Sequence, residues 1–147
     1  MDTRETVVLG TLAVAMFNVG VIWLTQRVVY PVWALVGEDE WRAYHDAHKR
    51  RLPGTVFVPH GLGVVGSALL VVWPPERVAV WTVWLALALP ITMAAATAAY
   101  WAPLQIRLST RLDRPLLRRL LATHWLRVAL ITAHGVVMWW IAAVAFA

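Results

Sequence analysis

The stretch that decides the fold is Leu120 to Phe146, which reads LLATHWLRVALITAHGVVMWWIAAVAF and contains no Asp or Glu. At 1.5 Å per residue, a helix of this length crosses the roughly 30 Å of membrane hydrocarbon. Three similar stretches precede it, at Thr6 to Val29, Thr55 to Trp73 and Val78 to Ala102. We therefore predict an all-α integral membrane four-helix bundle, in which residues 1 to 147 form a single transmembrane domain.

The composition supports this prediction. The chain is 61% hydrophobic and only 14% charged, whereas a soluble domain is about a quarter charged. It contains no Cys, which excludes disulfides, thiolate catalysis and Cys-ligated metal sites. The net charge of +5 comes from basic clusters beside apolar runs, so we expect no nucleic-acid partner and a lipid bilayer as the surroundings.

The distribution of Lys and Arg predicts the orientation in a bacterial plasma membrane. Only Arg4 and Arg77 flank the side that holds the termini. By the positive-inside rule, the long loops are predicted to be cytoplasmic and both termini outside. The ten basic residues on the cytoplasmic side are Arg27, Arg42, Lys49, Arg50, Arg51, Arg107, Arg111, Arg114, Arg118 and Arg119.

Tryptophan residues near the predicted boundaries are expected to form the aromatic belts of a membrane protein. The inner belt would consist of Trp33, Trp41, Trp101 and Trp125, and the outer belt of Trp73, Trp81, Trp139 and Trp140.

Between the first two spans, residues 38 to 52 are predicted to form an amphipathic helix on the cytoplasmic membrane surface. Its first turn is acidic and its last turn is basic, which complements the helix dipole, and Pro53 with Gly54 is expected to end it. One face of this helix follows the i, i+3, i+4, i+7 pattern and carries Trp41, Tyr44, His45 and His48.

Polar side chains inside membrane spans are energetically costly, so each is expected to have a partner or a wet cavity. On the fourth span, His124, Arg127 and His134 follow a heptad-like seam. One stripe of the first span carries Asn18, Ile22, Thr25 and Gln26, and one stripe of the second span carries His60, Gly63, Val64 and Ser67. We predict that these stripes and the seam meet in a pocket that opens to the cytoplasm beneath the surface helix. The polar residues within the spans are Asn18, Gln26, His60, Tyr100, His124, Arg127 and His134.

Several of these residues have a structural interpretation beside the functional one. Arg127 would either snorkel to the headgroups or contact a substrate. His134 would hydrogen-bond within the core, for example with Asn18. His45 and His48 would contact headgroups or, together with His60 and His124, hold copper or another transition metal.

Two short stretches resemble a known family. The run Leu120 to Arg127 contains His124-x-x-Arg127, similar to an N/H-x-x-R signature, and Trp41-x-x-Tyr44-His45-x-x-His48 with the later Pro59-His60 is similar to a W-x-x-x-H motif and its downstream Pro. The chain thereby resembles small bacterial four-span membrane proteins of the anthrone-oxygenase-like superfamily.

This resemblance implies a role in natural-product biosynthesis, on polycyclic aromatic substrates and without an evident bound cofactor. It implies a lipid-accessible pocket for an apolar substrate, with a matching polar set of His45, His48, His60, His124 and Arg127. Where the signature is expected to carry Asn, this chain has His124.

We predict acid–base, oxidation or cyclisation chemistry on a hydrophobic small molecule, as in a cofactor-independent oxygenase, isomerase or cyclase. A neutral His, with an ordinary pKa of about 6.5, can take a proton from a phenol or activated carbon, and an Arg can hold the resulting oxyanion. We therefore expect His60 and His124 to transfer protons and Arg127 to stabilise the anion. The predicted substrate-binding residues are Asn18, Gln26, Trp41, Tyr44, His45, His48, Tyr100 and His134.

The alternative is a non-catalytic membrane protein that binds haem, a metal or a lipid, or that supports a partner complex. No metal ligand or cofactor is predicted, although haem and copper are left open, as is a homo-oligomer. A proton-coupled cation exporter is disfavoured because the four spans contain no carboxylate.

Overall fold

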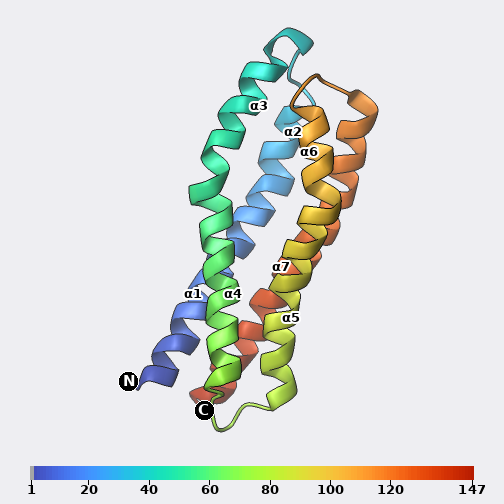
Figure 1. Ribbon diagram of the computed structural model, residues 1–147. Helices are drawn as coiled ribbons and strands as arrows, with labels where there is room; N and C mark the ends of the chain where they lie inside the picture. Colours follow the sequence, from blue (N-terminus) through green and yellow to red (C-terminus); the bar gives the residue numbers. More distant parts are fainter. Residues whose placement is uncertain (1) are drawn as a thin grey trace.

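The computed structural model describes residues 2–147, which fold into a bundle of four long helices (Figure 1). We call them helix 1 (Thr3–Trp33), helix 2 (Glu38–Val72), helix 3 (Val80–Leu108) and helix 4 (Arg114–Ala145). The first three are composite. Helix 1 consists of α1 (Thr3–Leu24), η1 (Thr25–Val29) and α2 (Tyr30–Trp33); helix 2 of α3 (Glu38–Leu52), η2 (Pro53–Phe57) and α4 (Val58–Val72); helix 3 of α5 (Val80–Ala96), η3 (Thr97–Trp101) and α6 (Ala102–Leu108); and helix 4 of α7 alone.

The predicted all-α membrane bundle is confirmed. All four helices are long and apolar enough to cross a membrane, and residues 2–147 contain no strand. The helices have 31, 35, 29 and 32 residues, so they extend over about 44 to 53 Å and exceed the roughly 30 Å of hydrocarbon. Large apolar side chains cover much of the outer surface, including Phe17, Leu62, Trp84 and Leu126, as expected for a multi-pass membrane protein.

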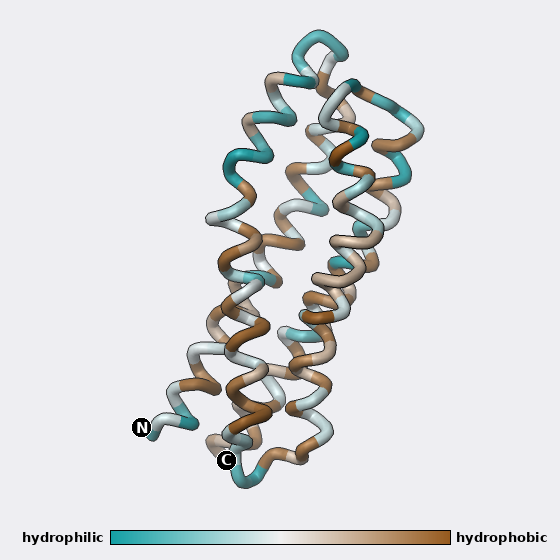
Figure 2. The backbone as a smooth tube through the Cα atoms, viewed as in Figure 1, coloured by the Kyte–Doolittle hydropathy of each residue, from teal (hydrophilic) through white to brown (hydrophobic). Residues whose placement is uncertain are grey.

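The predicted spans lie within these helices, apart from one or two residues at some ends, but each helix is longer than its span. Figure 2 shows that the added turns at one end of the bundle are largely hydrophilic. We call this the basic end; it holds the connections at residues 34–37 and 109–113. We call the opposite end, with the chain termini and residues 73–79, the terminal end (Figure 1).

The helices form a four-membered ring in which α1 and α5 each pack against α4 and α7. Glycines allow the close approach between α1 and α4, as is common in membrane bundles. A methyl group added to Gly66 would overlap the side chain of Thr11, and one added to Gly63 would lie 3.5 Å from the Asn18 amide nitrogen.

Helix 2 corrects the prediction of a separate surface helix. The amphipathic segment Glu38–Leu52 forms as α3, and Gly37 and the acidic first turn begin it as expected. However, the helix does not end at Pro53, because the π turn η2 carries it directly into α4. Consequently α3 does not turn across the end of the bundle but extends α4 along it (Figure 1).

Each composite helix changes from α to π geometry shortly before a proline. Proline has no N–H and its ring collides with the carbonyl four residues earlier, and the wider π turn relieves both problems. In all three cases the proline follows the π turn by two residues, so that the carbonyl in question lies inside the turn. The prolines are Pro31 after η1, Pro59 after η2 and Pro103 after η3.

Candidate functional site

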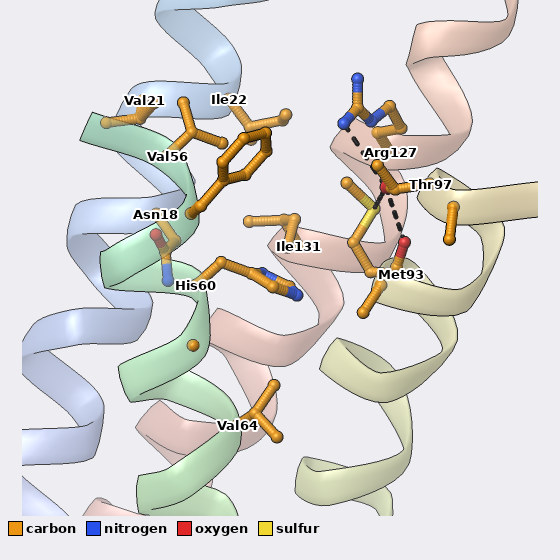
Figure 3. A pocket seen from close by; sticks show the side chains of 14 residues that line it. Asn18, Val21, Ile22, Val56, His60, Val64, Met93, Thr97, Arg127 and Ile131 are labelled. Carbon is orange, nitrogen blue, oxygen red and sulfur yellow. Dashed lines mark hydrogen bonds between the residues drawn. The ribbon is translucent and has the colours of Figure 1, made fainter. Parts of the chain in front are cut away.

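Two adjoining cavities lie between the helices, at the level of the three π turns. The central cavity, of about 440 Å³, is lined from four helices by residues that include Asn18, His60, Met93 and Ile131 (Figure 3). The basic-end cavity, of about 590 Å³, is lined by residues that include Tyr30, His48, Gln105 and His124. Both volumes fall in the range of about 300–1,000 Å³ found for small-molecule sites. Six residues line both cavities: Val21, Ile22, Val56, Phe57, Thr97 and Arg127.

Arg127 lies at the boundary of the two cavities and, within residues 2–147, has only neutral partners, among them the Tyr30 side chain. Its Nη2 donates a long hydrogen bond of 3.4 Å to Thr97 Oγ1, and its guanidinium carbon lies 5.1 Å from the centre of the Trp101 ring. Its Nε is buried and has no hydrogen-bond partner within residues 2–147. None of the eight Asp and Glu residues lines either cavity, so the guanidinium faces the hollow without a compensating anion.

His124 lies one turn before Arg127 on α7 and is 1% exposed. Its Nδ1 is 2.6 Å from Gln26 Oε1, and a carbonyl oxygen only accepts, so Nδ1 carries the proton in the neutral ring. The Nε2 lone pair makes no hydrogen bond within the described part of the chain. The ring lies edge-on to Tyr30, with centroids 4.5 Å apart, so His124 is held firmly while one nitrogen remains available to a ligand.

His60 and Asn18 line the central cavity and also connect helices. His60 extends from α4 toward α5 (Figure 3), where its Nε2 donates to the Pro90 carbonyl over 3.1 Å. Asn18 donates to the Pro59 carbonyl over 3.2 Å. The Nε2 proton of the neutral His60 ring is therefore used in the hydrogen bond that connects α4 to α5, and Nδ1 is the nitrogen that is free to act on a ligand.

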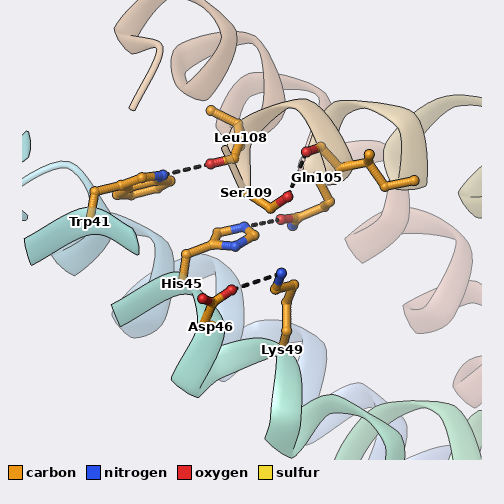
Figure 4. Close-up of polar contacts among 8 residues, drawn as sticks. Trp41, His45, Asp46, Lys49, Gln105, Leu108 and Ser109 are labelled. Atoms are coloured by element: carbon orange, nitrogen blue, oxygen red, sulfur yellow. Dashed lines mark hydrogen bonds and ion pairs between the residues drawn. The ribbon is translucent and has the colours of Figure 1, made fainter. Parts of the chain in front are cut away.

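The aromatic face of α3 closes the basic end of the bundle. Trp41 donates to the Leu108 carbonyl over 2.6 Å, and His45 Nε2 lies 3.1 Å from Gln105 Oε1 (Figure 4). Both side chains pack edge-on against Trp33, which is 0% exposed. Of the four residues predicted to lie over the pocket, only His48 lines a cavity; Trp41, Tyr44 and His45 attach α3 to the bundle instead.

The remaining predicted residues lie elsewhere. His134 bonds Ser67 over 3.1 Å rather than Asn18, and it lines neither cavity. Tyr100 lies outside the hollow, where Arg119 donates to its hydroxyl over 2.8 Å and stacks on its ring. Gln26 lines neither cavity, and its side-chain oxygen accepts the hydrogen bond from His124 Nδ1. The structure thus brings together His48, His60, His124, Arg127 and Asn18, and it separates His134 and Tyr100 from them.

Sequence reasoning missed several residues that line the hollow, among them Tyr30, Thr97 and Gln105. The inner tryptophan belt was also wrong in part, because Trp33, Trp41 and Trp101 are at most 3% exposed and form the core of the basic end. The spacing between threonines and prolines in the sequence does indicate where two of the π turns lie. Thr25 and Thr97 each begin a π turn and precede a proline by six positions, which marks equivalent levels of helices 1 and 3.

Comparison of the chain with protein-family models, with curated proteins and with solved structures finds no match.

Proposed function

We propose that this membrane protein binds a hydrophobic small molecule in the hollow between its helices and transfers a proton on it. His124 Nε2 would take a proton from a phenol or an activated carbon, and the Arg127 guanidinium would pair with the oxyanion that results. Such a proton transfer begins many oxidations, isomerisations and cyclisations. The resemblance to anthrone-oxygenase-like proteins favours a polycyclic aromatic substrate in a biosynthetic pathway.

One observation carries this proposal: Arg127 faces two adjoining cavities without a carboxylate partner, one helical turn from an imidazole with a free nitrogen. A buried charge with no counterion is costly in a membrane protein, and an anion formed on the ligand would offset that cost. The apolar lining of the central cavity would exclude water and so strengthen the attraction between them. His60, whose Nδ1 is free, is a second proton-transfer group in the same hollow.

Hydrogen–deuterium exchange tests the chemistry without requiring the natural substrate. Anthrone, a tricyclic ketone with an activated methylene group, would be incubated in D₂O with the purified protein in lipid nanodiscs, and the loss of its methylene proton signal followed by NMR. We expect the wild-type protein to accelerate exchange and His124→Ala to lose roughly a hundredfold or more of that acceleration.

Arg119→Met is the matched control, because Arg119 lies on the same helix but contacts Tyr100 outside the hollow. It should exchange anthrone at the wild-type rate. Acceleration that survives in His124→Ala, or that is absent from the wild-type protein, contradicts the proposed chemistry. In that case a non-catalytic role in binding a lipid, haem or metal becomes the better interpretation.

The proposed location is the plasma membrane, with the basic end in the cytoplasm and both termini outside, as the positive-inside rule indicates. Because the chain has no Cys, single introduced cysteines report on topology without background. On intact cells, a membrane-impermeant maleimide should label Pro74→Cys at the terminal end and leave Thr110→Cys at the basic end unlabelled. Both positions are exposed, so the reverse pattern would overturn this orientation.

A further inference from the structure

The central cavity opens sideways, toward the surface that faces lipid. Its lining includes Phe57 and Gly61 of helix 2 and Ala94 and Ala98 of helix 3, and all four are exposed. A methyl group added to Gly61 would meet nothing within 4 Å. Small residues therefore border an opening between helices 2 and 3, and we call this opening the window.

The hollow changes in character along the bundle. Toward the middle of the bundle, the central cavity is lined mainly by apolar side chains such as Val64, Met93 and Ile131. Toward the basic end, the second cavity adds hydrogen-bonding groups from Tyr30 and Gln105. A molecule with an apolar body and a polar head would fill this space with its head toward the basic end.

The charge of the hollow selects an anionic head. Arg127 lies where the apolar and polar parts meet, and no acidic side chain lines either cavity. Two further basic residues at the basic-end cavity are already engaged, because Lys49 pairs with Asp46 over 2.8 Å and Arg51 donates to the Ala47 carbonyl over 2.9 Å. The side chains of Lys49 and Arg51 are also exposed, so Arg127 is the cation of the lining that faces the hollow without an acidic partner, which matches a ligand that carries a single negative charge.

We infer that the ligand is a hydrophobic acid, with one ionisable oxygen group on an apolar body, and that it passes from the lipid to Arg127 through the window. This inference rests on the proposed function, since it names the class of molecule that the same hollow takes. A hydrophobic acid in the leaflet at the basic end already has its head toward that end. It therefore reaches the hollow by lateral movement without crossing the membrane.

Binding of 9-anthracenecarboxylic acid and its methyl ester tests this inference. The two probes share the same apolar body, and energy transfer from the tryptophans to the anthracene ring reports binding to the protein in nanodiscs. We expect the acid to bind roughly tenfold to hundredfold more tightly than the ester, as a charge-assisted hydrogen bond to Arg127 would provide. Arg127→Met should abolish the difference, and Arg119→Met should retain it.

Arg127→Lys keeps the charge and guards against a folding defect in Arg127→Met, so it should retain part of the preference for the acid. Equal affinities of acid and ester for the wild-type protein overturn the inference. Displacement of the probe by acetate at the same concentration also overturns it, because the site would then bind small anions without need of an apolar body.

Variants at the window test the route. Gly61→Leu and Ala98→Leu place bulk at its border and should slow association of the acid severalfold, while Gly10→Leu, on α1 and with open space around it, should not. Unchanged association rates in both window variants contradict lateral passage.

The inference and the proposed function fail separately. If the acid binds as expected but the protein does not accelerate anthrone exchange, the ligand class is supported and the proposed chemistry is contradicted. If anthrone exchange depends on His124 but acid and ester bind equally, the proposed chemistry is supported and the ligand class is contradicted.

Discussion

The two halves of the bundle pack in different ways. Near the terminal end, the core is aliphatic and small, with Val8, Ala15, Leu70, Ala86 and Met138 among its members. Near the basic end, a separate core is built on four large aromatic side chains, Tyr30, Trp33, Trp41 and Trp101. The helices keep regular α geometry in the first half, and the three π turns border the cavities of the second.

This difference predicts that stability and the proposed function depend on different halves of the bundle. In lipid, helix association depends on close packing and interhelical hydrogen bonds rather than on the hydrophobic effect, and the glycines of the terminal half provide that contact. The basic half holds its helices apart with aromatic rings and side-chain hydrogen bonds, which leaves a hollow between them. We therefore expect substitutions in the two halves to affect different measurements.

The largest effect on stability is expected at Gly66, in the terminal half. Gly66→Leu would force the side chain into Thr11 and should destabilise the bundle by about 1 to 3 kcal/mol, the usual cost of overpacking. Gly61→Leu, five residues away in the same helix but at the window, should leave the thermal unfolding temperature nearly unchanged. Equal losses in the two variants, measured by circular dichroism in detergent, would contradict the contrast between the halves.

In the basic half, Gln26→Leu should reduce chemistry rather than stability. Gln26 fixes the His124 ring by accepting a hydrogen bond from its Nδ1–H group, so its loss would let the ring change tautomer and should slow anthrone exchange about tenfold. Gln26→Glu retains an acceptor oxygen and should recover most of the rate. A Gln26→Leu protein that exchanges anthrone at the wild-type rate would show that His124 needs no positioning.

A pair of hydrogen-bond deletions sharpens the comparison at a smaller scale. Ser67→Ala removes the partner of the buried His134 and should lower the unfolding free energy of the whole bundle by about 0.6 to 1.7 kcal/mol.

Trp41→Phe removes the hydrogen bond to the Leu108 carbonyl and should cost about 0.5 to 1.5 kcal/mol. This loss should be measured mainly as faster amide exchange in α3. Faster exchange spread equally over α3 and α4 would argue against a separately attached α3.

The smallest effect is expected at the ion pair of the terminal end. Arg4 and Glu76 lie 3.0 Å apart, but their side chains are 45% and 86% exposed. Arg4→Ala should therefore change the unfolding free energy by less than about 1 kcal/mol, and added salt should remove the difference. A larger loss would mean that the terminal end depends on this contact more than on its packed core.

The sequence predicted the number and positions of the spans, because length, hydropathy and the absence of acids are sufficient to identify membrane helices. It also predicted that His124 and Arg127 share a face that points inward. It did not predict that helix 2 continues through Pro53, because a proline followed by a glycine usually ends a helix, whereas here both residues lie inside the π turn η2. For the same reason, the predicted position of Trp41 and His45 above a pocket was wrong: once α3 extends α4, that face meets α6.

The sequence also does not predict that His134 lies apart from the hollow. His124, Arg127 and His134 follow one seam on α7, but whether a seam borders a cavity or a packed core depends on the neighbouring helix. Opposite His134, helix 2 presents Ser67, close to Gly63, whereas Arg127 borders the cavities beside Thr97 and Trp101 of η3. Patterns within one helix cannot report the size of residues on another.

The pairing of a ligand anion with Arg127 can be measured directly by solid-state NMR. The protein would be labelled with ¹⁵N in its arginine guanidinium groups and loaded with 9-anthracenecarboxylic acid labelled with ¹³C in its carboxyl group, and the dipolar coupling between the two labels recorded. We expect the coupling of a hydrogen-bonded pair, with N···O near 2.8 Å, which is retained in Arg119→Met and lost in Arg127→Lys. A bound acid without such a coupling, or with one that persists in Arg127→Lys, would show that the guanidinium does not hold the ligand.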